Sequence, residues 1–240
     1  LALARDARSE HPTDPAALQA LARSQLATRE TSSALASFRT LAEQLPKSAQ
    51  IHHLLGMAYL QAEDAKAASA SFNKALKLDP TMLPAAVALS SLELQNGRTQ
   101  EALRIARQIQ QQQPTIPVGY ELEGNAHGRA GAYANALKAY AVAYEHGQSS
   151  RLAVQLARAQ HQAGSASAAY QTLTHWLTTH PDDMMAHAAL GSIYQVNGKL
   201  QEAAEQYQKI VVRQPNNAIT LNDLSWIYYL QGDARALEYA

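Results

Sequence analysis

The side chains best placed to do chemistry are a carboxylate and an imidazole, Glu123 and His127, which lie four residues apart. On an α-helix that spacing puts both on one face, where they could share a hydrogen bond or a proton. A buried carboxylate without a partner would be costly, so we interpret the two as a structural polar pair. A ligand-binding or proton-linked role for the same pair is the alternative.

The nine histidines raise the question of a metal site, but their arrangement does not favour one. The chain has no cysteine and no HExxH motif, and His175 and His180 are five positions apart, a poor spacing for one helix face. A glycine-rich phosphate loop and a GxSxG nucleophile turn are also missing. We therefore expect no metal, no cofactor and no catalytic residues, and the sequence predicts a non-enzymatic protein.

The overall composition is that of a folded chain with a large apolar core and balanced charge. Hydrophobic residues make up 47% of the sequence, and 20 basic residues balance 20 acidic ones. Zero net charge provides no field that would attract nucleic acid, and no apolar run reaches transmembrane length. We expect neither nucleic-acid binding nor a membrane span, and the absence of cysteine excludes disulfides.

The sequence repeats with a period close to 34 residues. Prolines that close apolar segments recur at spacings of 34, 34, 34, 67 and 34, at Pro12, Pro46, Pro80, Pro114, Pro181 and Pro215. Glycines that end such segments recur at spacings of 34, 33, 34 and 34, at Gly97, Gly131, Gly164, Gly198 and Gly232. Both series place a one-residue deletion in the same unit. A period of this length is typical of an array in which each unit is a helix, a turn and a second helix.

Two columns of small residues are expected to let the paired helices of each unit approach closely. One column follows a leucine in the first helix, as at Gly56 and Gly191, and the other is alanine in the second helix, as at Ala68 and Ala203. The whole pattern resembles the tetratricopeptide repeat. The resemblance covers essentially the entire chain and implies an all-α fold, a right-handed α-solenoid of stacked helix–turn–helix repeats.

The alignment predicts six complete repeats, the fourth of them one residue short, at 15–48, 49–82, 83–116, 117–149, 150–183 and 184–217. We expect residues 1–14 to be the second helix of a truncated preceding repeat and residues 218–240 to be a truncated repeat. The chain therefore looks cut from a longer array at both ends. The exposed end faces predict either end-to-end self-association or disorder at one end.

The first helices of the repeats are expected to line a concave groove in which a partner binds. Their inward positions mix charged, aromatic and amide side chains, as a peptide-binding groove does. The predicted partner-binding residues are His53, Met57, Glu121, Asn125, Arg129, Arg158, His161, Asn222, Trp226 and Tyr229. The alternative is a solvated face without a specific ligand.

Several segments are also similar to bacterial repeat proteins of polysaccharide secretion. They are YELEGN at 120–125, SSRLAVQLARAQHQAG at 149–164, HWLTTHPDD at 175–183 and the segment 199–240. The resemblance is strongest to the TPR-repeat lipoprotein of the exosortase/PEP-CTERM system. Related sequence motifs, QPNN followed by LNxLxW and GDxRALE, also occur in scaffolds of cellulose export.

The resemblance implies a protein–protein interaction scaffold in the periplasm or outer-membrane-associated envelope of a Gram-negative bacterium. Its partners would be proteins or peptide segments of exopolysaccharide biosynthesis or export. A membrane would be reached only through a lipid anchor outside these 240 residues, because the acylated cysteine is not among them. Two alternatives stay open: direct binding of the exopolysaccharide, with Trp226 and Tyr229 as stacking surface, and a scaffold of cellulose- or alginate-type export.

Overall fold

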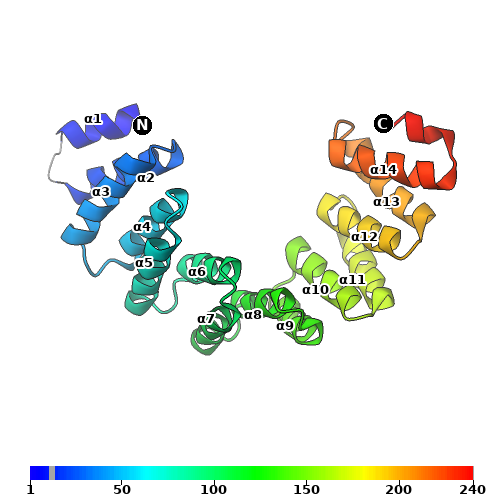
Figure 1. The fold of residues 1–240 in the computed structure, drawn as a ribbon, viewed down its shortest axis with the longest axis horizontal. Helices are drawn as coiled ribbons and strands as arrows, with labels where there is room; N and C mark the ends of the chain where they lie inside the picture. The colour runs from blue at the N-terminus through cyan, green and yellow to red at the C-terminus, as the bar shows by residue number, and fades with distance from the viewer. Residues whose placement is uncertain (11–13, 240) are drawn as a thin grey trace. The chain divides into compact units, whose positions relative to one another are not determined.

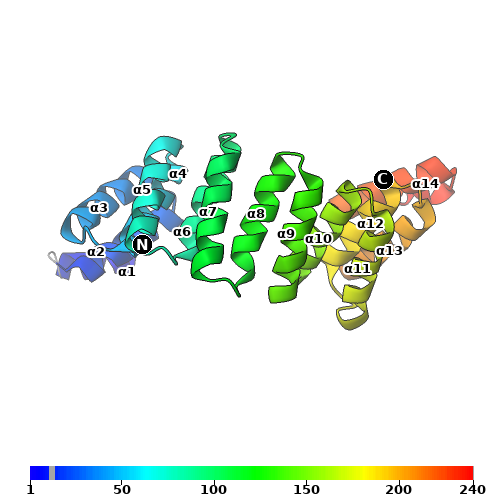
Figure 2. The same cartoon turned by 90° about the horizontal axis from the view of Figure 1, so that it is seen from below.

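The computed structural model describes residues 1–10 and 14–239, so Pro12 of the proline series lies outside the described residues. This described part is helical and contains no β-strand, which confirms the all-α prediction. None of its helices is long and apolar enough to cross a membrane. The chain divides into two compact units, Leu1–Ala126 and His127–Ala240. Within each unit the helices pack in pairs, each running back beside the one before it (Figures 1 and 2).

The two larger apolar clusters of unit 1 are formed by α2 to α4 and by α5 to α8, and a smaller one joins Ala102, Leu103 and Ala126. Phe38 and Phe72 are fully buried in these clusters. The helices are α1 (Ala2–Glu10), α2 (Pro15–Ala27), α3 (Thr31–Gln44), α4 (Ala49–Gln61), α5 (Ala65–Leu78), α6 (Leu83–Gln95), α7 (Thr99–Gln112) and α8 (Pro117–Arg129), which runs through the unit boundary.

Unit 2 is built in the same way, with Trp176, Tyr207 and Tyr228 buried between successive helices. Its elements after α8 are α9 (Tyr133–His146), α10 (Ser150–Gln162), α11 (Ala166–Thr179), α12 (Met184–Val196), α13 (Leu200–Arg213), α14 (Ala218–Gln231) and a short 3₁₀ helix, η1 (Ala234–Leu237). The boundaries of the repeats themselves stay a prediction, because a helix assignment does not fix where a repeat begins.

The first helices of five repeats begin at a side-chain cap. The residue before each of these helices accepts a hydrogen bond from a backbone N–H of the first turn, which satisfies one of the donors that a helix start leaves open. The capping residues are Asp14, Ser48, Ser149, Asp183 and Asn217.

Two buried histidines join a first helix to the repeat before it. The ring Nε2–H of His52 donates to the carbonyl of Pro46 at 3.0 Å, and that of His187 donates to the carbonyl of Pro181 at 2.9 Å. Both prolines belong to the predicted series that closes each repeat. These histidines are therefore satisfied core residues that connect successive repeats.

The small residues of the first helices make room for an aromatic ring of the second helix. A Cβ atom built on Gly56 would lie 2.6 Å from the ring of Phe72, and one built on Gly191 would lie 2.8 Å from the ring of Tyr207. At Gly56 and Gly191 the nearest neighbours are thus aromatic rings, rather than the alanines expected from the sequence. Those alanines, Ala68 and Ala203, are fully buried nearby.

Glu123 of α8 is half-buried and accepts a hydrogen bond from Gln110 of the preceding helix α7. The distance from Gln110 Nε2 to Glu123 Oε2 is 2.7 Å, and the same amide also lies 3.3 Å from the carbonyl of Gly119. A partner on α7 was not anticipated from the sequence, and the predicted pairing of Glu123 with His127 stays a prediction. Gln110 occupies a column that is apolar in the other repeats, as at Leu76.

The turn between the two helices of a repeat requires a left-handed backbone. Five glycines adopt it, with φ between 67° and 88°. In the repeats 15–48 and 49–82 the same place is taken by Arg29 and Glu63, which have φ of 61° and 60°. A side chain in this region is strained by roughly 1–2 kcal/mol, so these two turns store energy that the other five avoid.

Replacing Glu63 with glycine should therefore stabilise the protein. The strain is relieved, and the greater entropy of glycine in the unfolded chain offsets part of it, leaving a gain of about 0.5–1 kcal/mol. Urea denaturation of the parent and of the Glu63→Gly variant measures this difference in unfolding free energy. The matched control is Gly97→Ala, where an added Cβ meets nothing within 4 Å. Gly97→Ala should lower the unfolding free energy by about 1 kcal/mol, because alanine is strained in the left-handed backbone conformation. A Glu63→Gly protein no more stable than the parent would contradict the strain.

A double-mutant cycle tests the Gln110–Glu123 contact. Gln110→Leu leaves the half-buried carboxylate without its amide donor and should cost about 1–3 kcal/mol of unfolding free energy. Adding Glu123→Leu makes both positions apolar, as they are in the other repeats, so the double variant should recover most of the lost stability. The coupling free energy between the two substitutions should be about 1 kcal/mol. Gln111→Leu, at an exposed neighbour on α7, is the control and should be nearly neutral. Strict additivity would show that the two side chains do not interact.

Candidate functional site

Unit 2 presents the exposed side chains of its first helices, α10, α12 and α14, as one surface. Helices α10 and α12 line a common hollow, and Ala188 of α12 packs against the apolar cluster that contains Leu224 of α14. We call one group of exposed and half-exposed side chains on these helices the first-helix face. It comprises Arg151, Arg158, His161, Gln162, Met185, Ser192, Val196, Ile219, Asn222, Trp226, Tyr229 and Leu230.

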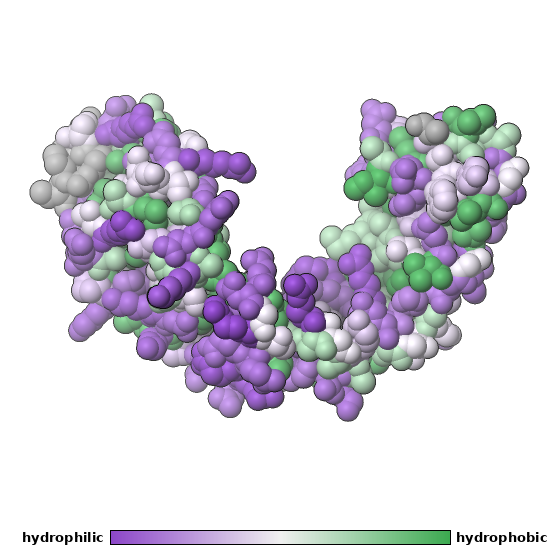
Figure 3. Space-filling model, viewed as in Figure 1, coloured by the Kyte–Doolittle hydropathy of each residue, from purple (hydrophilic) through white to green (hydrophobic). Residues whose placement is uncertain are grey.

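An aromatic pair on α14 is the most prominent feature of the first-helix face. Trp226 and Tyr229 are stacked, with ring centroids 5.7 Å apart and planes inclined by 27°. They are 53% and 66% exposed, and the neighbouring Leu230 is 50% exposed. Hydrophobic surface gathers over α12 to α14 in the space-filling view (Figure 3). Large apolar side chains that remain in water are typical of a binding surface.

Four further apolar residues of this face were missed in the sequence analysis. Met185 and Ile219 occupy the second position of successive repeats, and Val196 and Leu230 occupy the thirteenth. All four are exposed. The signal was available, because both positions carry a large apolar residue in two repeats in a row.

The first-helix face carries positive charge at α10. The sequences of α10 and α12 contain neither Asp nor Glu, whereas α10 contains Arg158. The acid of α14, Asp223, is half-buried, and the pKa of Tyr207 on α13 is raised to about 12 by burial and then by the Asp223 charge. Burial also raises the pKa of the Asp223 carboxyl. Asp223 therefore lies near the hydroxyl of Tyr207, which donates to the side chain of Gln195 on α12.

Two of the predicted residues, Arg158 and His161, share the hollow between α10 and α12. Its volume is about 110 Å³, and Ser192 and Val196 line it from α12. The side-chain amide of Asn197 lies 2.9 Å from the Nε2 atom of His161. The hollow has room for a small side chain or a few waters.

Another predicted residue, Asn222, lines a hollow of about 360 Å³ between α14 and the end of the described chain. Glu238 and Tyr239 form its other wall, and the hydroxyl of Ser225 donates to the carbonyl of Ala236 across it at 2.9 Å. The structure thus places Asn222 next to a polar recess, and Trp226 and Tyr229 on exposed surface.

The remaining predicted residues differ in how far they reach the surface. Arg129 and Met57 are exposed, and Asn125 is half-buried. His53 packs its ring 5.7 Å from that of Phe72, and burial lowers the pKa of its imidazole. Glu121 is only 7% exposed, and its role in partner binding stays a prediction. Val154, which occupies the same fifth position of its repeat, is also buried, whereas Val87 and Asn222 at that position are exposed.

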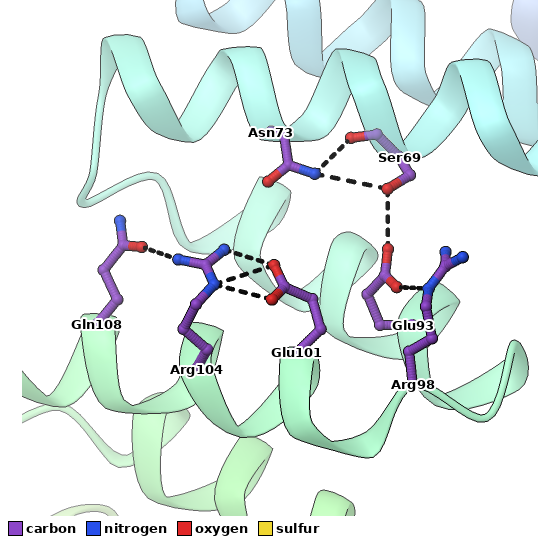
Figure 4. A network of polar contacts seen from close by, with 7 residues as sticks. All are labelled: Ser69, Asn73, Glu93, Arg98, Glu101, Arg104 and Gln108. Carbon is purple, nitrogen blue, oxygen red and sulfur yellow. Dashed lines mark hydrogen bonds and ion pairs between the residues drawn. The ribbon is translucent and has the colours of Figure 1, made fainter.

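Unit 1 contains a polar recess of about 680 Å³ formed by α5, the end of α6 and the start of α7 (Figure 4). Glu93 is 2% exposed at its base and accepts from the hydroxyl of Ser69 at 2.8 Å and from the guanidinium of Arg98. Glu101 accepts three hydrogen bonds from Arg104, which lower the pKa of its carboxyl. Both carboxylates are paired with arginines of the protein, so the recess is a neutralised polar network.

The described residues contain no group of three or more His, Cys, Asp or Glu side chains that could hold a metal ion. The chemistry that the arrangement does offer is non-covalent. It can bury apolar side chains against α14, and it can pair a carboxylate with Arg158 on α10.

The chain is similar in fold to solved helical-repeat proteins. A tetratricopeptide repeat protein from Parabacteroides merdae is 16% identical, with a TM-score of 0.68 over 93% of this chain and 89% of that chain. The protein in the structure titled functional characterization of Pseudomonas aeruginosa pilF is 18% identical, with a TM-score of 0.61 over 80% and 88%.

The APC/C hetero-tetramer Cut9-Hcn1 contains a chain that is 17% identical, with a TM-score of 0.62. The match covers 96% of this chain but 46% of that chain. At these identities the likeness concerns the fold alone. A search of curated protein sequences finds no significant match.

Two family models described as tetratricopeptide repeat match the sequence. One matches residues 20–82, 151–218 and 188–236, which together make up more than half of the chain, and the other matches residues 59–119. Repeats of this family generally mediate protein–protein interaction. The match agrees with the paired helices, the left-handed turns and the small-over-aromatic packing described above. The chain belongs to the tetratricopeptide repeat family.

Proposed function

We propose that this protein is a non-enzymatic scaffold that binds segments of other proteins through the first-helix face of unit 2. The observation that carries the proposal is the exposed, stacked pair of Trp226 and Tyr229 on α14. Tryptophan and tyrosine are enriched among the residues that dominate binding energy at protein interfaces. Here they stand beside further exposed apolar side chains on α12 and α14.

The energy available from this pair is enough for specific recognition. An indole offers about 250 Å² of surface, so covering the exposed half of Trp226 would contribute about 3 kcal/mol at about 25 cal/mol per Å². The preformed stack also lowers the entropy lost on binding, because the two rings already restrict each other. Several smaller contacts along α10 and α12 would then add selectivity.

We place this scaffold in the cell envelope of a Gram-negative bacterium, in exopolysaccharide biosynthesis or export linked to an exosortase/PEP-CTERM system. The support is the sequence resemblance at 120–125, 149–164, 175–183 and 199–240. A periplasmic location and a lipid anchor outside these residues belong to the same proposal, as does end-to-end self-association. Cellulose- or alginate-type export is the neighbouring alternative.

Direct binding of a polysaccharide is a second candidate function, favoured by the same aromatic pair. Stacked rings can support the apolar face of a sugar while amides such as Asn222 donate to its hydroxyls. On the first-helix face, however, the aromatic side chains belong to α14 alone. A peptide segment uses the apolar residues of α12 as well, so we rank protein binding first.

Peptides selected from a displayed random library against the 240-residue protein test the proposal. The selected peptides should lose about tenfold or more in affinity for a Trp226→Ala variant, because truncating a central aromatic anchor costs about 2 kcal/mol. Fluorescence anisotropy measures the affinities. Val212→Ala, at an exposed apolar residue of α13, is the matched control and should bind as the parent does.

Equal binding of the selected peptides to the parent and to Trp226→Ala would refute this face as the binding surface. Cello-oligosaccharides and alginate oligosaccharides are titrated in parallel. If an oligosaccharide binds in a Trp226-dependent way and no library peptide does, the polysaccharide function replaces the one proposed.

A further inference from the structure

We infer that the segment recognised by the first-helix face is acidic at one end and apolar at the other. Its carboxylate pairs with Arg158 on α10, and its aromatic or aliphatic side chain covers Trp226 and Tyr229 on α14. This inference rests on the proposed function and specifies the chemistry of the partner.

The character of the face changes in a regular way from α10 to α14. From α10 to α14 the residue at the ninth position of the repeat changes from a cation to a hydroxyl and then to an aromatic ring. The residues at the second and thirteenth positions change from polar on α10 to apolar on α12 and α14. The residues in that order are Arg151, Met185 and Ile219 at the second position, Arg158, Ser192 and Trp226 at the ninth, and Gln162, Val196 and Leu230 at the thirteenth. One end of the face is therefore suited to charge and the other to apolar surface.

The charge of the partner follows from the arginine on α10 and from the absence of acid on α10 and α12. Arg158 is exposed, and the ion pairs found among the described residues do not involve it. A carboxylate can pair with a guanidinium through two parallel hydrogen bonds, which a neutral side chain cannot reproduce. A basic segment would meet positive charge at α10 and no carboxylate on α10 or α12. A wholly apolar segment would cover the guanidinium without a partner, at a cost.

The spacing of the two ends follows from the repeat geometry. Packed helices lie about 10 Å apart, so α10 and α14 are separated by about 20 Å across α12. An extended chain advances about 3.3 Å per residue, which places the acidic and apolar residues about six positions apart. We take the segment as extended, because a helix would need about twice as many residues to cover that distance and an extended segment is the shortest that reaches both ends.

Synthetic peptides of matched composition test the inference. The acidic probe carries an Asp-Asp pair and, about six residues of glycine, serine and threonine further on, a Phe-Leu pair. A second probe replaces both aspartates with lysine, a third replaces Phe-Leu with serine, and each is also made in the reverse order. Affinities for the 240-residue protein are measured by fluorescence anisotropy up to millimolar concentration.

The acidic probe, in one of its two orders, should bind about tenfold or more tightly than both the lysine and the serine probe. In the Arg158→Glu variant the preference should reverse, with the acidic probe weakened by about tenfold and the lysine probe strengthened. Lys209→Glu makes the same change in charge at an exposed residue of α13 and should shift either affinity by no more than about twofold.

Three results would overturn the inference: equal binding of the acidic and lysine probes, an unchanged affinity of Arg158→Glu for the acidic probe, or no binding in either order. The peptide library described under the proposed function distinguishes a failure of this inference from a failure of the proposed function. Selected peptides that need Trp226 but bind Arg158→Glu as tightly as the parent would contradict only the inference that the partner is acidic. Selected peptides that need neither residue would contradict both this inference and the proposed function.

Discussion

The rest of the structure depends on how closely the two helices of a repeat can approach. The first helix carries glycine, alanine or serine where the second helix presents its large core residue, and the ring of Tyr207 lies so close to Gly191 that a methyl group would overlap it. Burying such rings adds apolar contact to these helix pairs. The positions of α10, α12 and α14 that do not face the second helix, such as Trp226 and Tyr229, are exposed to water.

Two sets of polar residues in this interior are satisfied by partners from outside their own helix. Glu93 sits where Tyr59 and Tyr194 stand in other repeats, and Ser69 and Arg98 satisfy its carboxylate. Gln110 and Glu123 replace apolar residues on two adjacent helices and bond to each other. A lone substitution of either kind would remove a hydrogen-bond partner from a buried or half-buried polar group, so these changes are best tolerated as sets.

The helical fold and the left-handed turns could be predicted because they follow from local sequence. A 34-residue period and glycine at one position specify the helix pair and its turn without knowledge of neighbouring repeats. The shared face of Trp226 and Tyr229 could be predicted for the same reason, since their spacing puts them on one side of α14. The burial of Glu121 could not be predicted from that spacing, because it depends on how tightly adjacent repeats pack around α8.

Contacts between repeats were the other limit of the sequence analysis. The bond from Gln110 to Glu123 becomes visible only when columns of consecutive helices are compared, and a search for partners within α8 misses it. The apolar residues Met185 and Ile219 were missed because they lie beside the helix caps Asp183 and Asn217. Exposure at that point is decided by the path of the preceding turn, which helical periodicity does not describe.

The left-handed turns at Arg29 and Glu63 also bear on the order in which the protein loses structure. Because each repeat contacts chiefly its neighbours, strain at a turn weakens its own repeat more than distant ones. Local opening should begin in the repeats 15–48 and 49–82, where hydrogen exchange would be fastest, while unit 2 keeps its glycine turns. A solution warm enough to fray the amino-terminal repeats would then still contain an intact aromatic surface on α14.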